Sequence, residues 1–346
     1  MGAREIRVGV MGGSGYVGGE LLRLLVQHPR VTVTAVSSQT YRGKAVARLH
    51  PNLRGVPLDK FIHPDEFPEV DVLFAALPHG VLMNQIDPLM AISERVIDLS
   101  ADFRLRQAEE YDSWYGLAHP RPALLSEFAY GMPELHREEI RGANCVAAPG
   151  CTATAAILPL KPLVDAFDVT LAVVDAKVGS SAGGAKVSSA SHHPERSGVI
   201  RSFKPSGHRH IAEMVQELGL AETSINFSPH GVEMVRGIQS TAHVFIDGDF
   251  SEKDVWQIYL KAYRDEPFIR MVKERSGIYR FPEPKLVAGT NFCDIGFEKD
   301  PRTGRLVVMT AIDNLMKGAA GQAVQCFNLM CDFPEETGLQ ALALHP

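Results

Sequence analysis

The sequence predicts an α/β protein made of two domains, and three observations support this prediction. The chain has 346 residues, which is long for one ordinary domain and suits two. Its first fifty or so residues alternate between strand-like and helix-like patterns around a glycine-rich turn. Beyond residue 150 longer strand-like runs dominate. We therefore expect a parallel-sheet domain followed by an α+β domain with a large, mostly antiparallel sheet.

The first domain opens with a strand, a glycine turn, a helix and a second strand. An apolar run at 6–11 leads into glycines at positions 12, 15 and 18, leucines follow at helical spacing, and a β-branched run covers 31–36. Glycines let the backbone approach a pyrophosphate, and a helix N-terminus offers free N–H groups. This order predicts a Rossmann-type cofactor site rather than a turn that only packs a helix on a strand. The expected cofactor contacts in the turn are Gly12, Ser14, Gly15, Tyr16 and Val17.

The residues after the second strand favour NADP over NAD. NAD sites usually place an acidic residue there to hold the ribose hydroxyls. This chain instead has Ser37, Ser38 and Gln39, followed by the cations Arg42 and Lys44. Hydroxyls and cations suit a 2′-phosphate, so NADPH is the expected cofactor.

Further strand-like runs extend the first sheet and place polar residues at its edge. They cover 71–77, 95–99 and 144–148. Pro78 lies in the loop after the first of these runs, where cofactors lie in open α/β sheets. Arg104 follows the second run and is either a solvated side chain near a helix start or an anion clamp for the substrate.

The second domain is predicted from longer strands and intervening helices. The strand-like stretches are 169–177, 224–228, 237–246, 291–297 and 305–312, and the helical candidates are 209–218, 251–263 and about 318–330. We assign residues 1–148, completed by 315–346, to cofactor binding, and residues 149–314 to catalysis and oligomerisation. Wide sheets are commonly buried between subunits, so we expect a homodimer or homotetramer.

Composition and charge exclude several classes of protein. Thirty-five basic and 41 acidic side chains give a net charge of −6, which argues against a globally basic nucleic-acid binder. No apolar run reaches the roughly 18 residues of a membrane span. The strand pattern begins at once, so we expect no signal peptide. Five cysteines do not form a disulfide framework in a chain of this length, and we expect a soluble cytoplasmic protein without membrane partners.

Cys151 is the candidate nucleophile. It follows Pro149-Gly150 and precedes an alanine-rich helical run, so it lies at a helix N-terminus, where the helix dipole favours thiolate over thiol. A buried structural cysteine is the alternative, and we assign that role to the other four. Those four are Cys145, Cys293, Cys326 and Cys331.

Two histidines are candidates for proton transfer. His208 and His210 flank Arg209 where a helix is expected to begin, and histidine titrates in the range that acid–base work requires. A surface or capping role is the alternative for each. His192 and His193 lie nearby in the sequence, but no carboxylate or cysteine joins these histidines at a ligand spacing, so we expect no metal.

Several motifs together resemble the N-acetyl-glutamyl-phosphate reductase family. They occur in the family's order and cover nearly the whole chain: GGSGYVGGELLRLL, ALPHG, DLSADFR, PGCTATA, HRH before a helix, and AIDNLMKGAAGQAVQ. The segments SASHHPER, FKPSGHRH, VRGI and GTNF are similar to the lysine-biosynthesis, or LysY, branch. Thr152 is a departure, because arginine-branch members often have tyrosine after the cysteine and LysY-type members often have asparagine.

The resemblance implies a glyceraldehyde-3-phosphate-dehydrogenase-like fold and an NADPH-dependent acyl-phosphate reductase. In such a reaction Cys151 attacks the acyl phosphate, phosphate leaves, the thioester is reduced, and His208 or His210 donates the proton as the aldehyde departs. Backbone N–H groups at the helix start are expected to hold the oxyanion. By resemblance Asn314 lies near the nicotinamide end of the cofactor, although a helix N-cap is its local alternative.

The branch implies a substrate carried by a protein. LysY-type enzymes reduce L-2-aminoadipate 6-phosphate while its amino group is attached to the acidic carrier protein LysW. The stretch 192–210 holds Arg196, Arg201, Lys204 and Arg209 against one acid, Glu195, and is either a solvated loop or a basic rim for this carrier. Arg209 is also expected to contact the substrate. The glutamyl analogue is a second expected substrate, which would let one enzyme serve both pathways. The alternatives are the arginine-pathway reductase of N-acetyl-glutamyl phosphate and a non-catalytic NADPH-binding regulator.

Overall fold

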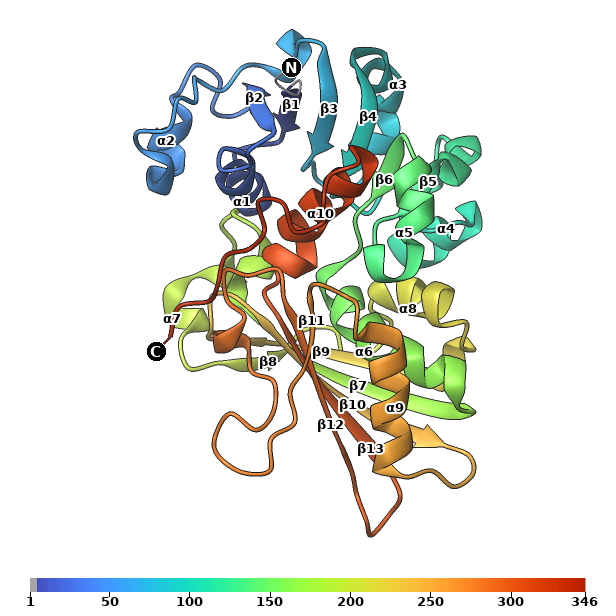
Figure 1. Cartoon of the computed structure of the whole chain (residues 1–346). Coiled ribbons are helices and arrows are strands. Elements are labelled where there is room, and N and C mark those ends of the chain that lie inside the picture. Colours follow the sequence, from blue (N-terminus) through green and yellow to red (C-terminus); the bar gives the residue numbers. More distant parts are fainter. Residues whose placement is uncertain (1–4, 346) are drawn as a thin grey trace. The chain divides into compact units, whose positions relative to one another are not determined.

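The computed structural model describes residues 5–345 and divides the chain into two compact units. The first unit runs up to Pro149 and takes in Ala319–Gln340, and the second comprises Gly150–Gly318 with the last residues of the chain. Both units are α/β (Figure 1). The predicted fold class, a Rossmann-type unit and an α+β unit with a mostly antiparallel sheet, is confirmed.

The first unit is built on a six-stranded parallel sheet with the order β2-β1-β3-β4-β6-β5. Its strands are β1 (Ile6–Met11), β2 (Val31–Val36), β3 (Val70–Ala75), β4 (Ser93–Asp98), β5 (Phe128–Tyr130) and β6 (Cys145–Ala147). The strand residues toward the carboxyl ends are almost all buried, as in a parallel sheet covered by helices on both faces. The order reverses around β1, and cofactors bind near the carboxyl ends of strands at such a point.

Helices α1 (Tyr16–Leu25), α2 (Val46–Leu49), α3 (Leu82–Ile92), α4 (Ala108–Tyr115) and α5 (Pro133–Gly142) connect these strands. A π-helical segment, Met316–Ala320, precedes the last helix, α10 (Gly321–Met330). Helix α10 is buried along its whole length in the first unit, where Gln322 donates a hydrogen bond to the carbonyl of Gly131 at 2.8 Å. The red α10 beside α1 and α5 in Figure 1 therefore joins a unit formed mainly by the blue and green N-terminal half of the chain.

The second unit has a seven-stranded mixed sheet with the order β11-β12-β13-β10-β7-β9-β8. Its strands are β7 (Val169–Val178), β8 (Ile200–Ser202), β9 (Ile225–Val232), β10 (Ile238–Ile246), β11 (Ile269–Met271), β12 (Cys293–Lys299) and β13 (Leu306–Ile312). Buried residues alternate with half-exposed ones along β7, β9 and β10, so one face of the sheet forms a core.

Four helices belong to the second unit: α6 (Cys151–Ala166), α7 (His193–Arg196), α8 (His210–Leu218) and α9 (Glu252–Tyr263). Helix α6 packs on β10 and β13. Tyr259 of α9 donates a hydrogen bond to the carbonyl of Pro159 in α6 at 2.7 Å, and Trp256 packs edge-on against Phe297 of β12. These two helices cover the same face of the sheet, so α6 presents its N-terminus at a fixed place.

The structure contains three short strands that the sequence pattern did not predict, and one predicted strand is longer than expected. Strands β5, β8 and β11 have three residues each, too few to show an alternating pattern. Strand β9 continues four residues past the predicted end at 228, through Pro229. Proline is typical of strand edges and ends, but here β9 stays paired with β7 through Gly231. No helix within residues 5–345 is long and apolar enough to cross a membrane.

Short 3-10 turns complete both units. They are Pro51–Leu53, Pro64–Glu66 and Pro122–Glu127 in the first unit and Ser180–Gly183, Ser189–Ser191, Glu222–Ser224 and Pro284–Leu286 in the second.

Candidate active site

The glycine turn of the first unit forms a cradle that no larger residue fits. Gly12 has a φ of +77°, and a Cβ at this position would lie 2.3 Å from the carbonyl oxygen of Ala76. A Cβ at Gly18 would lie 2.6 Å from Gly13, so α1 packs directly on the turn. Gly15 caps α1 without a side chain, and its first turn has no acidic residue. This arrangement fits the pyrophosphate of a dinucleotide, because backbone N–H groups and the positive end of the helix dipole remain available to an anion.

The two predicted serines lie where β2 ends and are both buried, but only one of them has a hydrogen-bond partner for its hydroxyl. Ser38 donates a hydrogen bond from Oγ to Ser14 Oγ at 2.9 Å and so links the end of β2 to the glycine turn. Ser37 is fully buried, and its Oγ has no hydrogen-bond partner within the described part of the chain. Gln39 is exposed. The contacts of all three with a cofactor stay predictions.

Of the basic residues that follow β2, one forms an ion pair and two line a surface hollow. Arg42 forms an ion pair with Glu66. Lys44 and Arg48 are exposed and, with Tyr41 and Leu49, line a hollow of about 290 Å³. Arg48 was not recognised from sequence, although its place four residues after Lys44 at a helix start was a usable signal. Two cations beside an aromatic ring suit a phosphate attached to a nucleoside.

An acidic residue that sequence reasoning missed shapes the loop containing Pro78. Asp102 accepts hydrogen bonds from the N–H groups of Gly80 at 2.7 Å and Met83 at 3.0 Å. Pro78 itself is exposed on this loop. Arg104 is buried, and its Nε donates to the carbonyl of Ala148 at 2.7 Å. The guanidinium of Arg104 therefore ties β4 to β6, and its predicted role as an anion clamp stays a prediction.

In the second unit, Cys151 is the first residue of α6 and follows the cap residue Gly150. It is not part of a disulfide, and its exposure is intermediate. A Cβ at Gly318 would lie 2.7 Å from the Cβ of Cys151, so the π-helical segment leaves space for this side chain only because it has glycine there. The first N–H groups of a helix have no partner within the helix. The position therefore suits both a thiolate and a developing oxyanion.

The two predicted histidines contact each other beside this helix start. Their rings are 4.7 Å apart and nearly perpendicular. The backbone N–H of His210 donates a hydrogen bond to Nδ1 of the His208 ring at 3.2 Å, so Nδ1 of His208 is an acceptor. Burial, together with the positive charges of Arg209 and Lys204, lowers the pKa of His208 to about 4. His208 is therefore neutral at physiological pH, with its proton on Nε2.

Two contacts of His210 were not expected from the sequence. Nδ1 of His210 lies 2.5 Å from Oγ1 of Thr152, the residue that departs from the family pattern. Nε2 of His210 lies 3.9 Å from Oε1 of Glu213, which is fully buried. Oε2 of Glu213 accepts the N–H of Gly150 at 2.8 Å. The spacing of His210 and Glu213, three residues apart on one helix, was the signal that could have found the acid.

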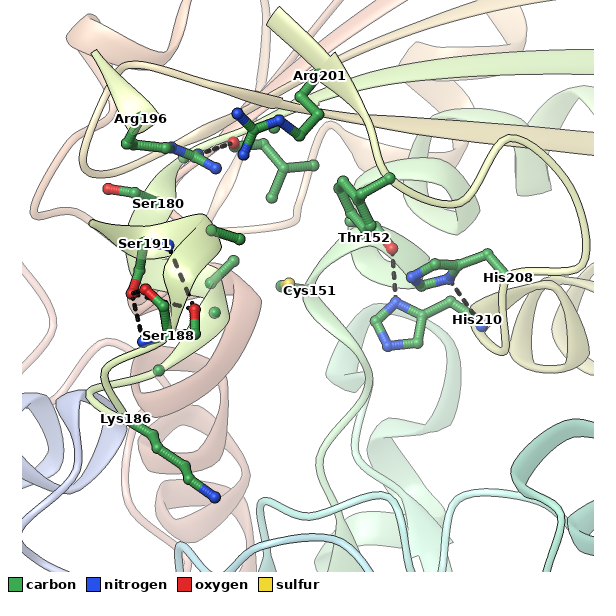
Figure 2. Close-up of a pocket in the computed structure, with 18 of the residues that line it drawn as sticks. Cys151, Thr152, Ser180, Lys186, Ser188, Ser191, Arg196, Arg201, His208 and His210 are labelled. Atoms are coloured by element: carbon green, nitrogen blue, oxygen red, sulfur yellow. Dashed lines mark hydrogen bonds between the residues drawn. The ribbon is translucent and has the colours of Figure 1, made fainter. Parts of the chain in front are cut away.

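Cys151 and both histidines line one cavity of about 390 Å³. In Figure 2 the side chain of Cys151 lies between the histidine pair and a wall that includes Ser188 and Ser191. Of the four cations predicted to form a rim, three line the cavity: Arg196, Arg201 and Arg209. Lys204 is not among the lining residues, whereas Lys186 is. The cavity therefore combines the candidate nucleophile, the two candidate proton donors and positive charge, which suits an anionic acyl substrate.

Arg196 and Arg201 are held by backbone carbonyls rather than by acids. Arg196 donates to the carbonyls of Val232 at 2.6 Å and Val178 at 3.3 Å, and Arg201 donates to the carbonyl of Glu195 at 2.7 Å. Burial lowers the pKa of Arg196, and the charge of Arg201 lowers it further. Within residues 5–345, no acidic side chain forms an ion pair with Arg196 or Arg201. An entering anion would therefore interact favourably with both guanidinium groups.

Asn314 has a structural role in the second unit. Its Oδ1 accepts the N–H of Gly237 at 2.7 Å, and its Nδ2 donates to Ser181 Oγ at 2.9 Å. The helix-capping contacts are made instead by Asp313, which accepts the N–H of Leu315 at 2.8 Å. The alternative interpretation of Asn314 as an N-cap was therefore wrong, and its contact with a cofactor stays a prediction.

The remaining cysteines are mostly core residues. Cys145, Cys293 and Cys326 are buried, as predicted, whereas Cys331 is half-buried and its sulfur lies 3.4 Å from the guanidinium of Arg95. The assignment of Cys331 to the core was therefore wrong, because it ends α10 rather than lying within it. Across residues 5–345, no group of three or more His, Cys, Asp or Glu side chains is placed to hold a metal ion.

Comparison with family models matches both units. Residues 7–143 match the semialdehyde dehydrogenase NAD-binding domain, and residues 151–314 match the semialdehyde dehydrogenase dimerisation domain. Among solved structures, aspartate semialdehyde dehydrogenase II of Vibrio cholerae, complexed with ASA, superimposes with a TM-score of 0.72 at 18% identity, covering 95% of this chain and 99% of that one. This likeness shows the fold, and the expected glyceraldehyde-3-phosphate-dehydrogenase-like architecture is confirmed.

Curated relatives are much closer in sequence. A protein of Thermomicrobium roseum assigned as LysW-L-2-aminoadipate 6-phosphate reductase is 55% identical, and the match covers 99% of both chains. The LysW-L-2-aminoadipate/LysW-L-glutamate phosphate reductase of Saccharolobus solfataricus is 47% identical, again over 99% of both. The resemblance to LysY-type reductases, and with it the prediction of an NAD(P)-binding oxidoreductase, is confirmed. The chain belongs to the semialdehyde dehydrogenase family.

Proposed function

We propose that this enzyme uses NADPH to reduce carrier-linked L-2-aminoadipate 6-phosphate to the semialdehyde, in lysine biosynthesis. The observation that carries the proposal is the joint lining of one cavity by Cys151, His208 and His210. A nucleophile at a helix start beside two imidazoles is the arrangement that acyl transfer through a thioester requires. Residues 1–148 with 315–346 serve as the cofactor domain, and 149–314 as the catalytic and oligomerisation domain.

The first step is attack of the Cys151 thiolate on the acyl-phosphate carbonyl. The new C–S bond forms, the C–O bond to phosphate breaks, and phosphate leaves with the electron pair. N–H groups in the first turn of α6 stabilise the negative charge on the carbonyl oxygen. The cations that line the cavity, Arg196, Arg201 and Arg209, attract the doubly charged phosphoryl group.

The second step reduces the thioester and releases the aldehyde. Bound NADPH supplies the hydride that this step consumes, and the glycine cradle of Gly12 and Gly18 with Ser38 and Lys44 would hold it. As the C–S bond breaks, His208 or His210 donates a proton to the sulfur of Cys151. If His208 is the donor, the proton comes from its Nε2, because its Nδ1 already accepts a hydrogen bond.

The substrate is inferred from relatives and from the charge of the cavity. The relative from Thermomicrobium roseum, named for the aminoadipate derivative, matches over nearly the full length. A second substrate, the glutamyl analogue on the same carrier, is favoured because the Saccharolobus solfataricus enzyme is named for both. Arg196, Arg201 and Lys204 lie on one short segment, and we place the acidic carrier against it.

The enzyme would work as a homodimer or homotetramer in the cytoplasm. The match of residues 151–314 to a dimerisation domain supports the oligomer. All five cysteines are free thiols, which suits a reducing compartment.

Three substrates test the reaction and its specificity together. We expect NADPH oxidation with LysW-linked aminoadipyl phosphate, a slower reaction with the LysW-linked glutamyl phosphate, and little with N-acetyl-glutamyl phosphate. C151S should lower kcat by at least about a thousandfold, while NADPH binding, measured by its fluorescence, stays unchanged. Preference for the N-acetyl substrate would favour the arginine-pathway reductase. Undiminished turnover by C151S would contradict the thioester route.

The carrier contact has its own test. Replacing Arg196, Arg201 and Lys204 with alanine should raise KM for the carrier-linked substrate while NADPH affinity is preserved. Arg196 and Arg201 also line the cavity, whereas Lys204 does not. The single variant K204A therefore tests carrier binding without changing the cavity lining. K204A should raise KM only for the carrier-linked form, and more at low ionic strength. An unchanged KM in the triple variant would remove the docking segment from the proposal.

A further inference from the structure

The buried carboxyl group of Glu213 connects the candidate proton carrier to the helix that presents the nucleophile. Glu213 lies on α8 and is fully buried. One of its oxygens accepts the N–H of Gly150 at 2.8 Å, and the other lies 3.9 Å from Nε2 of His210. The reaction as proposed above gives this side chain no role.

The three groups are packed so closely that Gly150 has to be glycine. A Cβ at position 150 would lie 2.5 Å from the His210 ring and 2.8 Å from Oε1 of Glu213. Movement of Glu213 would therefore displace both the His210 ring and the turn before Cys151. Thr152 fixes the opposite side of the ring, with Oγ1 2.5 Å from Nδ1.

A carboxylate near an imidazole favours its protonated form, and the effect is strong where water is excluded. Among the described residues, other titratable or charged groups near His210 include His208, whose ring is 4.7 Å away, the adjacent Arg209, and Cys151 in the same cavity. Arg209 and a protonated His208 would disfavour a charge on His210. Among these residues, Glu213 and a Cys151 thiolate are the groups that would stabilise that charge.

We propose that Glu213 is a positioning residue: it holds the turn before Cys151 through Gly150 and keeps His210 oriented and protonated for proton donation. The assignment of the donated proton rests on the proposed reductase function. The effect of Glu213 on the His210 ring does not, and it can be measured without substrate. A purely structural interpretation, in which Glu213 only caps the helix start, predicts no dependence on its charge.

E213Q separates charge from hydrogen bonding, because an amide oxygen still accepts the N–H of Gly150 but carries no charge. The matched control is E217Q, the same change one turn later on α8 at another buried glutamate, which accepts a hydrogen bond from the side chain of Gln216. Proteins labelled with ¹³C at histidine are titrated by NMR, and H210N assigns the His210 signal. Urea unfolding of each variant reports whether the fold is kept.

We expect E213Q to lower the titration midpoint of the His210 ring by at least about one pH unit. The basic limb of the kcat profile should move to lower pH by a similar amount, with kcat at pH 8 falling at least tenfold. E217Q should leave both unchanged. A folded E213Q whose His210 midpoint stays within about 0.3 pH units of the wild type would overturn the proposal.

E213D keeps the negative charge but moves the carboxylate away from Gly150 and His210, because aspartate is one methylene shorter. We expect its His210 midpoint to stay near the wild type while kcat falls, because the hold on Gly150 is loosened. If E213Q proved unstable, an E213D midpoint about one pH unit below that of the wild type would still overturn the proposal. If the midpoints shift as expected but no aldehyde forms from any acyl phosphate, the proposed function fails and the positioning effect of Glu213 stands.

Discussion

Two helices, α1 in the first unit and α6 in the second, begin directly after a glycine that follows a strand, yet their N-termini serve different purposes. Gly15 caps α1, and the first turn of α1 has no acidic residue. Gly150 caps α6, but its N–H is occupied by the carboxyl group of Glu213, and the next residue is Cys151, the candidate nucleophile. One helix dipole is left for an external anion, whereas the other acts on a side chain of the protein itself.

This difference shows why a glycine before a helix is ambiguous in a sequence. In the turn before α1, Gly12 is held at positive φ, and there is no room for a side chain. A ligand can therefore approach the backbone closely. In α6 Gly150 makes room for two neighbouring side chains, His210 and Glu213. The same residue type therefore leaves the backbone open to a ligand in one unit and makes room for two buried side chains in the other.

The largest expected effect comes from closing the first of these spaces. G12A forces a non-glycine residue to a φ of +77° and places its Cβ 2.3 Å from the Ala76 carbonyl. We expect the first unit to lose roughly 4 kcal/mol of stability, from strain and overpacking together. The loss is measured by urea unfolding in a W256F background, so that Trp114 reports the first unit.

G55A is the matched control for this prediction. Gly55 has a similar φ of +85°, but nothing lies within 4 Å of an added Cβ. It should lose only about 1 kcal/mol, the cost of the backbone conformation alone. Equal losses in both variants would show that the glycine turn has no steric requirement, and the comparison of the two helix starts would fail. Alkylation of Cys151 by iodoacetamide should be the same in G12A and the wild type.

The strands and the glycine cradle were predictable from sequence because they depend on local pattern. The predicted ends of β1 and β2 coincide with the observed ones, since apolar runs stop at the glycine turn and at the serines. Cys151 and the two histidines were also recognisable, because their residue types and helix starts carry the signal. Asp102 and Thr152 were not, since their hydrogen-bond partners lie 19 and 58 residues away in the chain. Glu213 had a local signal only in its spacing from His210, because its hydrogen bond to Gly150 spans 63 residues. Tertiary hydrogen bonds of this kind leave no periodicity.

The second prediction concerns the pH dependence of stability near α6. The pKa of His208 falls from its ordinary value of 6.5 to about 4, mainly through burial. Between these values the unfolded chain binds a proton that the folded chain does not, so stability falls as pH drops from about 6.5 to 4 and levels off below. The wild type should lose up to about 3 kcal/mol from this group.

H208N removes this group and should lose about 3 kcal/mol less than the wild type between pH 7 and pH 4. The transition is followed through Trp256 in a W114F background, because the effect belongs to the second unit. H192N, which replaces an exposed histidine of the same segment, should behave like the wild type. If H208N loses as much stability as the wild type, burial does not keep His208 neutral, and its assignment as a neutral donor is wrong.

The smallest expected effect tests which cations at the first unit's edge recognise the cofactor. Lys44 and Arg48 line a hollow with Tyr41, whereas Arg42 is already paired with Glu66. A phosphate gains most from cations that have no acidic partner, since a paired guanidinium would first have to leave its carboxylate.

K44Q and R48Q should each raise the Kd for NADPH about tenfold, equivalent to about 1.4 kcal/mol, and leave the Kd for NADH unchanged. R42Q should change either Kd by less than about threefold. The constants are measured by fluorescence titration, and a larger effect of R42Q than of K44Q would reassign the 2′-phosphate to Arg42, away from the hollow.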